Sequence, residues 1–134
     1  MSSPERLRGG CLCGAVGYEV EDDFKYAMNC HCSRCRKAMG SAFKPMGGIE
    51  VEKVRLTRGQ DRLLVVGEPD GTHDLRCRDC GSLLYSIVRE GTWAHVTYGT
   101  LTDAPSLPIQ MHIMVGSKAP WLTITDDLPQ HREF

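Results

Sequence analysis

The chain has 134 residues, of which 41% are hydrophobic and 25% charged, values that are ordinary for one globular domain. Its 16 basic and 17 acidic side chains give a formal net charge of −1, which excludes the basic balance expected of a general nucleic-acid-binding domain. The first ten residues lack the apolar run of a signal peptide and no segment is apolar enough to cross a bilayer, so we expect a cytoplasmic protein with reduced thiols.

Short runs in which apolar and polar residues alternate predict β-strands along most of the chain. In chain order they are Ala15–Glu21, Phe24–Asn29, Val51–Thr57, Asp61–Gly67, Ser82–Val88, Thr92–Tyr98 and Ile109–Val115. Turn signals separate them, namely Gly47-Gly48, Arg58-Gly59, Pro69 to Gly71, Glu90-Gly91 and Asp103 to Pro105.

One helical turn is expected at Ser33–Met39, with Ser33 as its N-cap and Gly40 at its end. In the proline-rich tail, Trp121 is expected to pack on the sheet. The spacing of the short strands predicts a mainly β fold of folded-over sheets. We expect a single domain over residues 1–134, with its core at about 8–130.

Seven cysteines fall into three clusters along the chain. The clusters are Cys11 and Cys13, then Cys30, Cys32 and Cys35, then Cys77 and Cys80. A turn of two or three residues can place two sulfurs about 2.3 Å from one ion, and Gly14 and Gly81 stand where a positive φ would close such a turn. We therefore predict zinc bound through thiolates. A disulfide or redox pair at Cys77–Cys80, an iron–sulfur cluster, and buried cysteines without metal remain alternatives.

Seven sulfurs divide most simply into a closed set of four and an open set of three. Spacing alone does not say which clusters join. The simplest division unites the first and third clusters as a structural site and leaves Cys30, Cys32 and Cys35 as an open site. His31 as a fourth ligand that closes the second site is the alternative.

Cations surround the middle cluster. Arg34, Arg36 and Lys37 would offset the negative charge of three thiolates on Zn²⁺ and could hold an anionic thiol ligand. The plainer interpretation is a solvated helix face.

Three segments carry a family resemblance that runs over about residues 8–130. They are Gly10 to Gly14, Cys30 to Lys37 and Cys77 to Gly81, and the tail from His112 to Trp121 and from Asp126 to Gln130 is similar too. The chain resembles the glutathione-dependent formaldehyde-activating enzyme family, which includes the centromere protein V type.

The resemblance implies a tent-like, zinc-ribbon-like arrangement of β-sheets with two zinc sites. One zinc would be structural, at Cys11, Cys13, Cys77 and Cys80. The other would be more loosely held and linked with substrate, at Cys30, Cys32 and Cys35. The implied activity joins formaldehyde and glutathione into the S-hydroxymethyl adduct and is classed as a carbon–sulfur lyase.

The leading hypothesis is therefore a zinc-dependent enzyme that acts on a thiol adduct, with a small thiol such as glutathione as its partner. His31, His73, His95 and His112 are candidates for proton delivery by residue type alone. The competing hypotheses are a non-catalytic zinc-binding module and a thiol or zinc sensor. Neither a membrane nor nucleic acid is expected as a partner.

Overall fold

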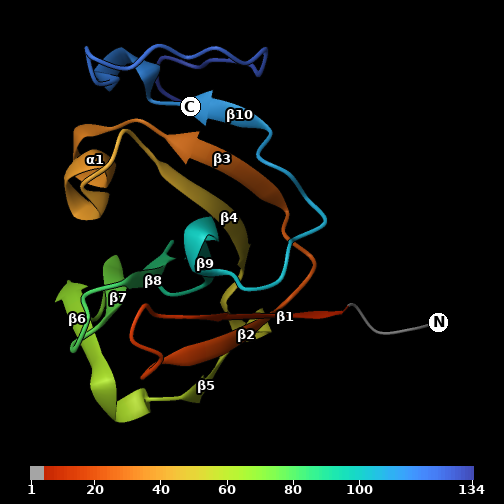
Figure 1. Ribbon diagram of the computed structural model, residues 1–134, viewed down its shortest axis with the longest axis vertical. Coiled ribbons are helices and arrows are strands. Elements are labelled where there is room, and N and C mark those ends of the chain that lie inside the picture. Colours follow the sequence, from red (N-terminus) through yellow and green to blue (C-terminus); the bar gives the residue numbers. More distant parts are fainter. Residues whose placement is uncertain (1–4) are drawn as a thin grey trace.

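The strands form two β-sheets in the computed structural model, which describes residues 5–134 (Figure 1). The smaller sheet is antiparallel, with the order β1 (Arg6–Gly10), β2 (Gly17–Glu21) and β5 (Val54–Arg58). Residues 1–4 of the predicted domain lie outside the described residues.

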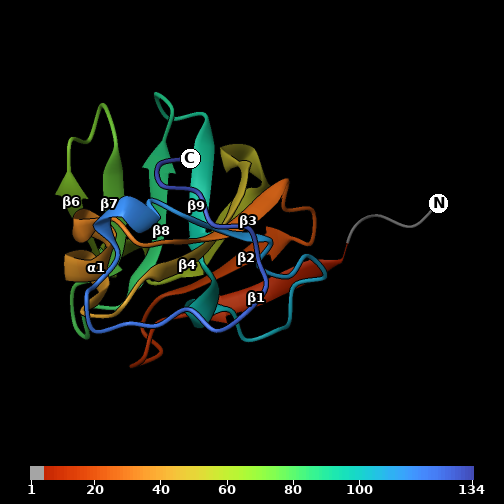
Figure 2. The same ribbon diagram turned by 90° about the horizontal axis from the view of Figure 1, so that it is seen from above.

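The larger sheet has seven strands in the order β10-β3-β4-β9-β8-β7-β6. Their bounds are β3 Tyr26–Cys30, β4 Lys44–Glu50, β6 Leu63–Gly67, β7 His73–Cys77, β8 Leu83–Val88, β9 Trp93–Thr97 and β10 Met111–Ile113. β10 pairs with β3 in parallel, and the other pairs are antiparallel. Seen from above, the hairpins β6–β7 and β8–β9 stand side by side (Figure 2).

Helical segments are short. The α-helix α1 (Ser33–Met39) connects β3 to β4. Single 3-10 turns occupy Val51–Lys53, Gln60–Arg62, Tyr98–Thr100 and Val115–Ser117. Within residues 5–134, no helix has the length and apolar character needed to cross a membrane.

The main core lies between the two sheets. β2 alternates buried and less buried positions, and its Tyr18 and Val20 pack with Leu84 and Tyr85 of the larger sheet. The rings of Tyr18 and Tyr85 meet edge to face, with centroids 5.7 Å apart. A second, smaller cluster contains Met28, Cys30, Met46 and Ile113, with Cys32 and Cys35 against it. Hence the three-cysteine segment is packed on its own apolar layer at the β10-β3-β4 end of the sheet.

The mainly β fold with one short helix is confirmed, and α1 has the predicted bounds. The N-cap is one residue earlier than predicted. Cys32 is the cap, and its Sγ accepts a hydrogen bond from the amide of Cys35. The predicted packing of Trp121 on the sheet is wrong, because 70% of its surface is exposed.

Strand β4 was not predicted, because Gly47-Gly48 is typical of a turn but here lies within a strand. Aromatic rings explain the two glycines. A Cβ on Gly48 would stand 2.1 Å from the ring of Tyr26, and one on Gly47 would meet the rings of Tyr98 and Phe24. β1 and β7 were missed as well, since RLRGG and HDLRC have few of the β-branched and aromatic residues that favour strands.

Gly59 offers a test of the connection between β5 and β6. Its φ is +77°, and a Cβ there would lie 2.1 Å from the carbonyl oxygen of Ala15. Gly91 has a φ of +86° but open space around it. We expect Gly91→Ala to lower the free energy of unfolding by about 1–2 kcal/mol through its left-handed backbone. Gly59→Ala should cost clearly more in urea unfolding, because a backbone overlap is added. Equal losses would contradict this account.

Candidate metal centres

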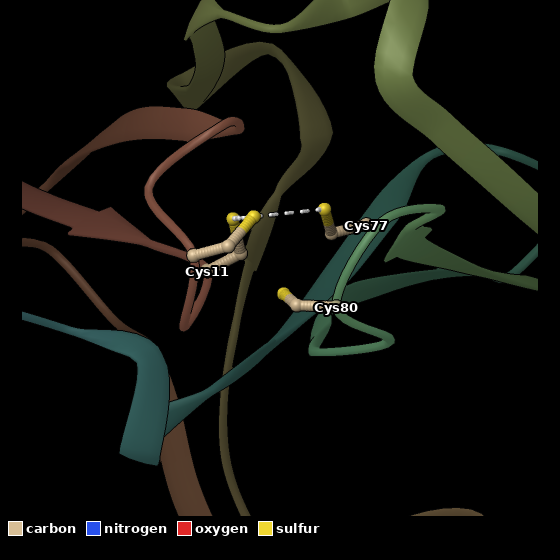
Figure 3. A group of neighbouring side chains, drawn as sticks. Cys11, Cys77 and Cys80 are labelled. Atoms are coloured by element: carbon tan, nitrogen blue, oxygen red, sulfur yellow. Dashed lines mark hydrogen bonds between the residues drawn. The ribbon is translucent and has the colours of Figure 1, made fainter.

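Four of the cysteines meet at the junction of the two sheets. Cys11 and Cys13 belong to the turn that follows β1, whereas Cys77 ends β7 and Cys80 lies in the turn before β8. Figure 3 shows Cys11 facing Cys77 and Cys80 across the gap between the two turns. The four sulfurs all lie within 4.8 Å of one another. The structure thus joins the first and third cysteine clusters.

Both turns are closed by glycine. The amide of Gly14 donates to the carbonyl of Cys11, and the amide of Gly81 donates to the carbonyl of Cys77. The two glycines have φ angles of +84° and +83°, which only glycine adopts without strain. The predicted role of these glycines is therefore confirmed, and it turns both pairs of thiols toward the same point.

The sulfur spacing fits a tetrahedral metal ion. The Sγ atoms of Cys11 and Cys13 are 3.7 Å apart, and those of Cys13 and Cys77 are 3.8 Å apart. Four sulfurs bound at about 2.3 Å in a tetrahedron would be separated by about 3.8 Å. A disulfide would bring two sulfurs to about 2.05 Å, and all seven cysteines are free thiols. The four-cysteine cluster can accordingly hold a metal ion.

Neighbouring donors prepare this cluster for negative charge. The hydroxyl of Ser82 lies 3.3 Å from the Cys80 sulfur and, with the Ser82 amide, lowers the pKa of Cys80 to about 5. The Ala15 amide lowers the pKa of Cys13, but desolvation and the neighbouring sulfurs outweigh it and raise that pKa to about 11. Four thiols at this spacing cannot all ionise unless a cation shares them, which is the condition that a bound metal supplies.

The remaining three cysteines form a second cluster at the junction of β3 and α1. Cys30 ends β3, Cys32 caps the helix and Cys35 lies in its first turn. Their sulfurs also lie within 4.8 Å of one another. Hydrogen bonding to Cys35 is the main cause that lowers the pKa of Cys30 to about 6. The two clusters thus offer four and three sulfurs, the division that the sequence predicts as the simplest.

A cavity of about 400 Å³ opens beside the three-cysteine cluster. Its walls come from α1 and from strands β4, β6, β8 and β9, together with residues next to and within β7. The lining residues are Cys32, Arg34, Cys35, Ala38, Lys44, Met46, Val66, Thr72, Asp74, Ser86, Val88 and His95. Of the three predicted cations, Arg34 lines this cavity, whereas Arg36 and Lys37 are on the last turn of α1.

His31 is fully buried and begins a chain of polar contacts. Its Nε2 lies 2.8 Å from Nδ1 of His112, and Nε2 of His112 is 3.0 Å from the carboxylate of Asp126. Within residues 5–134, the groups of side chains close enough to share a metal ion contain cysteines only, and His31 belongs to neither group. The chain instead joins the cysteine segment to β10 and to the C-terminal tail.

The other two candidate histidines occupy different settings. His73 contacts the carbonyls of Glu68 and Gly71 through Nδ1, within the β6–β7 turn. His95 lines the cavity, and its Nε2 lies 2.6 Å from the hydroxyl of Tyr26. Burial, followed by the charges of Lys44 and Arg89, lowers the pKa of His95 to about 4. At neutral pH His95 is therefore an uncharged ring.

Sequence reasoning missed three polar residues of the cavity, namely Lys44, Asp74 and Ser86. Each lies on a strand of the larger sheet, and two of those strands, β4 and β7, were not predicted. The only sign in the sequence is that Lys44 precedes a segment whose residues are mostly apolar or glycine, as expected of a lysine at the start of a buried strand. That signal says nothing about which side chains meet.

Comparisons with known proteins show which family this chain is similar to. The family model described as glutathione-dependent formaldehyde-activating enzyme matches residues 6–117. A Halomonas elongata protein, provisionally named as such an enzyme, is 30% identical over 136 residues, covering 88% of this chain and 80% of the relative. A Podospora anserina protein with the same provisional name is 30% identical over 91 residues, and the match spans 66% of this chain but only 41% of that relative. The crystal structure of a Rhodobacter sphaeroides protein superposes with a TM-score of 0.61 at 27% identity, covering 74% of this chain and 91% of that one.

Loss of a ligand should have different consequences at the two clusters. We expect Cys80→Ser to unfold or aggregate the protein, because metal bound between the sheets would contribute on the order of 10 kcal/mol to folding. Cys32→Ser should stay folded and lack one metal ion, because its cluster lies within one end of a single sheet. Metal per chain by mass spectrometry and thermal melting test both. A more destabilising Cys32→Ser would reverse the assignment.

The buried ring of His95 generates a pH dependence. In the unfolded chain a histidine binds a proton below about pH 6.5, whereas His95 in the folded protein stays neutral until about pH 4. Above about pH 6.5 the ring is neutral in both states and costs no stability. As the pH falls from 6.5 toward 4, the unfolded chain binds the proton first, so the free energy of unfolding decreases by on the order of 2–3 kcal/mol. His95→Gln should flatten that part of the profile of unfolding free energy against pH. Identical profiles for the two proteins would contradict the lowered pKa.

Proposed function

Because this chain belongs to the glutathione-dependent formaldehyde-activating enzyme family, we propose that it is a zinc-dependent carbon–sulfur lyase-like enzyme that acts on the adduct of formaldehyde with a small thiol such as glutathione. One observation carries the proposal. Three free cysteine thiols converge at the edge of a cavity that is large enough for part of a peptide-sized thiol. The chain spans less than half the length of the Podospora relative.

Zinc is the metal that best suits both donor sets. Thiolate ligands favour zinc, Cu(I) or iron–sulfur clusters, and four thiolates in a tetrahedron are typical of structural zinc. We assign Cys11, Cys13, Cys77 and Cys80 to this structural ion. Cys30, Cys32 and Cys35 would hold the second ion with one position free. Zinc held in this way would act as a Lewis acid and lower the pKa of a thiol that occupies the free position.

The side chains around the cavity then have separate tasks. Arg34 lines the cavity, where its guanidinium would hold a carboxylate of the thiol substrate. Arg36 and Lys37 extend the positive charge of the same short helix, and we propose them as further substrate contacts. The apolar side chains of Met46, Val66 and Val88 would displace water from the reacting carbon.

The reaction itself can be tested by exchange NMR. Zinc-loaded protein is mixed with glutathione and ¹³C-formaldehyde, and the exchange between free aldehyde hydrate and S-hydroxymethyl adduct is measured. We expect a faster exchange than in buffer, and a return to the buffer rate for Cys32→Ser. Arg55→Met is a control variant that should keep the wild-type rate, because Arg55 pairs with Glu19 on the smaller sheet and does not line the cavity.

The same measurement separates the competing functions. If a protein that carries two zinc ions does not accelerate the exchange, the formaldehyde reaction is excluded. A zinc-binding module or a thiol sensor would then be the remaining interpretation of the two clusters.

A further inference from the structure

Lys44 is a buried cation beside the three-cysteine cluster. It is the first residue of β4 and pairs with Cys30 in the ladder between β3 and β4. Only 5% of its surface is exposed, although a lysine normally keeps its ammonium in water. A buried ammonium is costly unless hydrogen bonds or an opposite charge compensate it. A buried ammonium at this position therefore requires acceptors for its N–H groups.

The structure supplies one such partner. Nζ of Lys44 donates to the hydroxyl of Ser86 at 2.8 Å, and that hydroxyl donates to the carboxylate of Asp74 at 2.5 Å. Within residues 5–134, no carboxylate lies within 4.0 Å of Nζ. An ammonium carries three N–H groups, so two of them have no protein acceptor among the described residues.

The cavity is the place where those two N–H groups can find an acceptor. Lys44, Ser86 and Asp74 lie together in its lining, which also includes Cys32 and Cys35. A ligand whose sulfur reached the cysteine cluster would carry its neighbouring atoms into this cavity. An oxygen on such a ligand, and above all a negatively charged one, is the acceptor that a desolvated ammonium favours.

We propose that Lys44 is the oxygen-binding residue of the three-cysteine site, and that its ammonium donates hydrogen bonds to an anionic oxygen carried close to the sulfur of the bound thiol. The inference rests on the proposed function for the identity of that thiol. Ser86 and Asp74 are positioning residues, because the Ser86 hydroxyl accepts a hydrogen bond from Nζ and is itself held by the carboxylate of Asp74.

In the proposed reaction this oxygen is the one that changes. A lone pair of the thiolate sulfur forms the new bond to the carbonyl carbon, and the π pair of the C=O bond moves onto the oxygen. The resulting alkoxide takes a proton from water, the hydroxide left behind takes up the proton that the thiol released on ionising, and the reverse reaction returns both protons. The ammonium form of Lys44 stabilises the negative oxygen by hydrogen bonding and charge.

A binding experiment tests this role without turnover. Calorimetry on the zinc-loaded protein compares mercaptoacetate, which carries a carboxylate next to its thiol-bearing carbon, with the neutral 2-mercaptoethanol. We expect the wild-type protein to bind mercaptoacetate about ten- to a hundredfold more tightly, the range for a hydrogen bond to a charged group. Lys44→Met, which keeps the length of the side chain, should lose most of the preference, and Lys25→Met, which changes an exposed lysine outside the cavity, should retain it.

Two further measurements distinguish oxygen binding by Lys44 from a purely structural role of this residue. Zinc per chain is determined for each variant, because Lys44 could instead only balance the charge of the three thiolates. Loss of zinc from Lys44→Met would assign it that counter-ion role and overturn the proposal. Ser86→Ala removes one hydroxyl and should reduce the preference partly at full zinc content, which keeps the proposal testable if Lys44→Met does not fold.

The outcomes separate this inference from the proposed function. A wild-type protein without the preference, or a Lys44→Met protein that keeps it, overturns the role of Lys44. If the preference depends on Lys44 but the wild type does not accelerate formaldehyde exchange, the thiol-oxyanion site stands and the formaldehyde reaction falls. If exchange is accelerated, Lys44→Met should slow it about a hundredfold with a smaller change in the KM for glutathione. An unchanged rate would overturn the catalytic contact.

Discussion

The meeting of four sulfurs between the two sheets is the constraint on which the rest of the fold depends. Cys11 and Cys13 follow the first strand of the smaller sheet, and Cys77 and Cys80 flank a turn of the larger one. Four thiolates within 4.8 Å of one another would repel, so a cation shared between the sulfurs would stabilise their ionised form. The apolar core around Tyr18 and Leu84 includes Cys77 and packs against Cys11 and Cys80 at this junction, and the amide of Leu12 donates a hydrogen bond to the hydroxyl of Ser82 across it.

The three-cysteine cluster is built on different terms. All of its sulfurs come from one segment, from the end of β3 through the first turn of α1, and its apolar support is the small cluster around Met28 and Met46. A metal ion there would join no distant parts of the chain. The adjoining cavity and its buried cation instead give this cluster the features of a binding site. Under the proposed assignment, one protein would use sulfur in two roles, one that holds the sheets together through a metal and one that faces a ligand.

Contacts distant in sequence position this second site. The chain of His31, His112 and Asp126 connects the cysteine segment to the C-terminal tail, and β10 adds to β3 in parallel at the same edge. In the cavity lining, Ser86 accepts a hydrogen bond from Lys44 and donates one to Asp74. The site is thus positioned by residues from the middle of the chain and from its C-terminal tail.

The sequence by itself determined the chemistry and most of the strands. Clustered cysteines followed by glycine predict metal-binding turns because the geometry is local, and the bounds of α1 follow from local propensity and capping in the same way. Only the tertiary structure decided which clusters join, that β4 passes through Gly47 and Gly48, and that Lys44 is buried in the cavity. These features depend on rings and strands that come together across large separations in sequence, as Tyr26 over Gly48 and Ser86 beside Lys44 do, and no local pattern encodes such pairings.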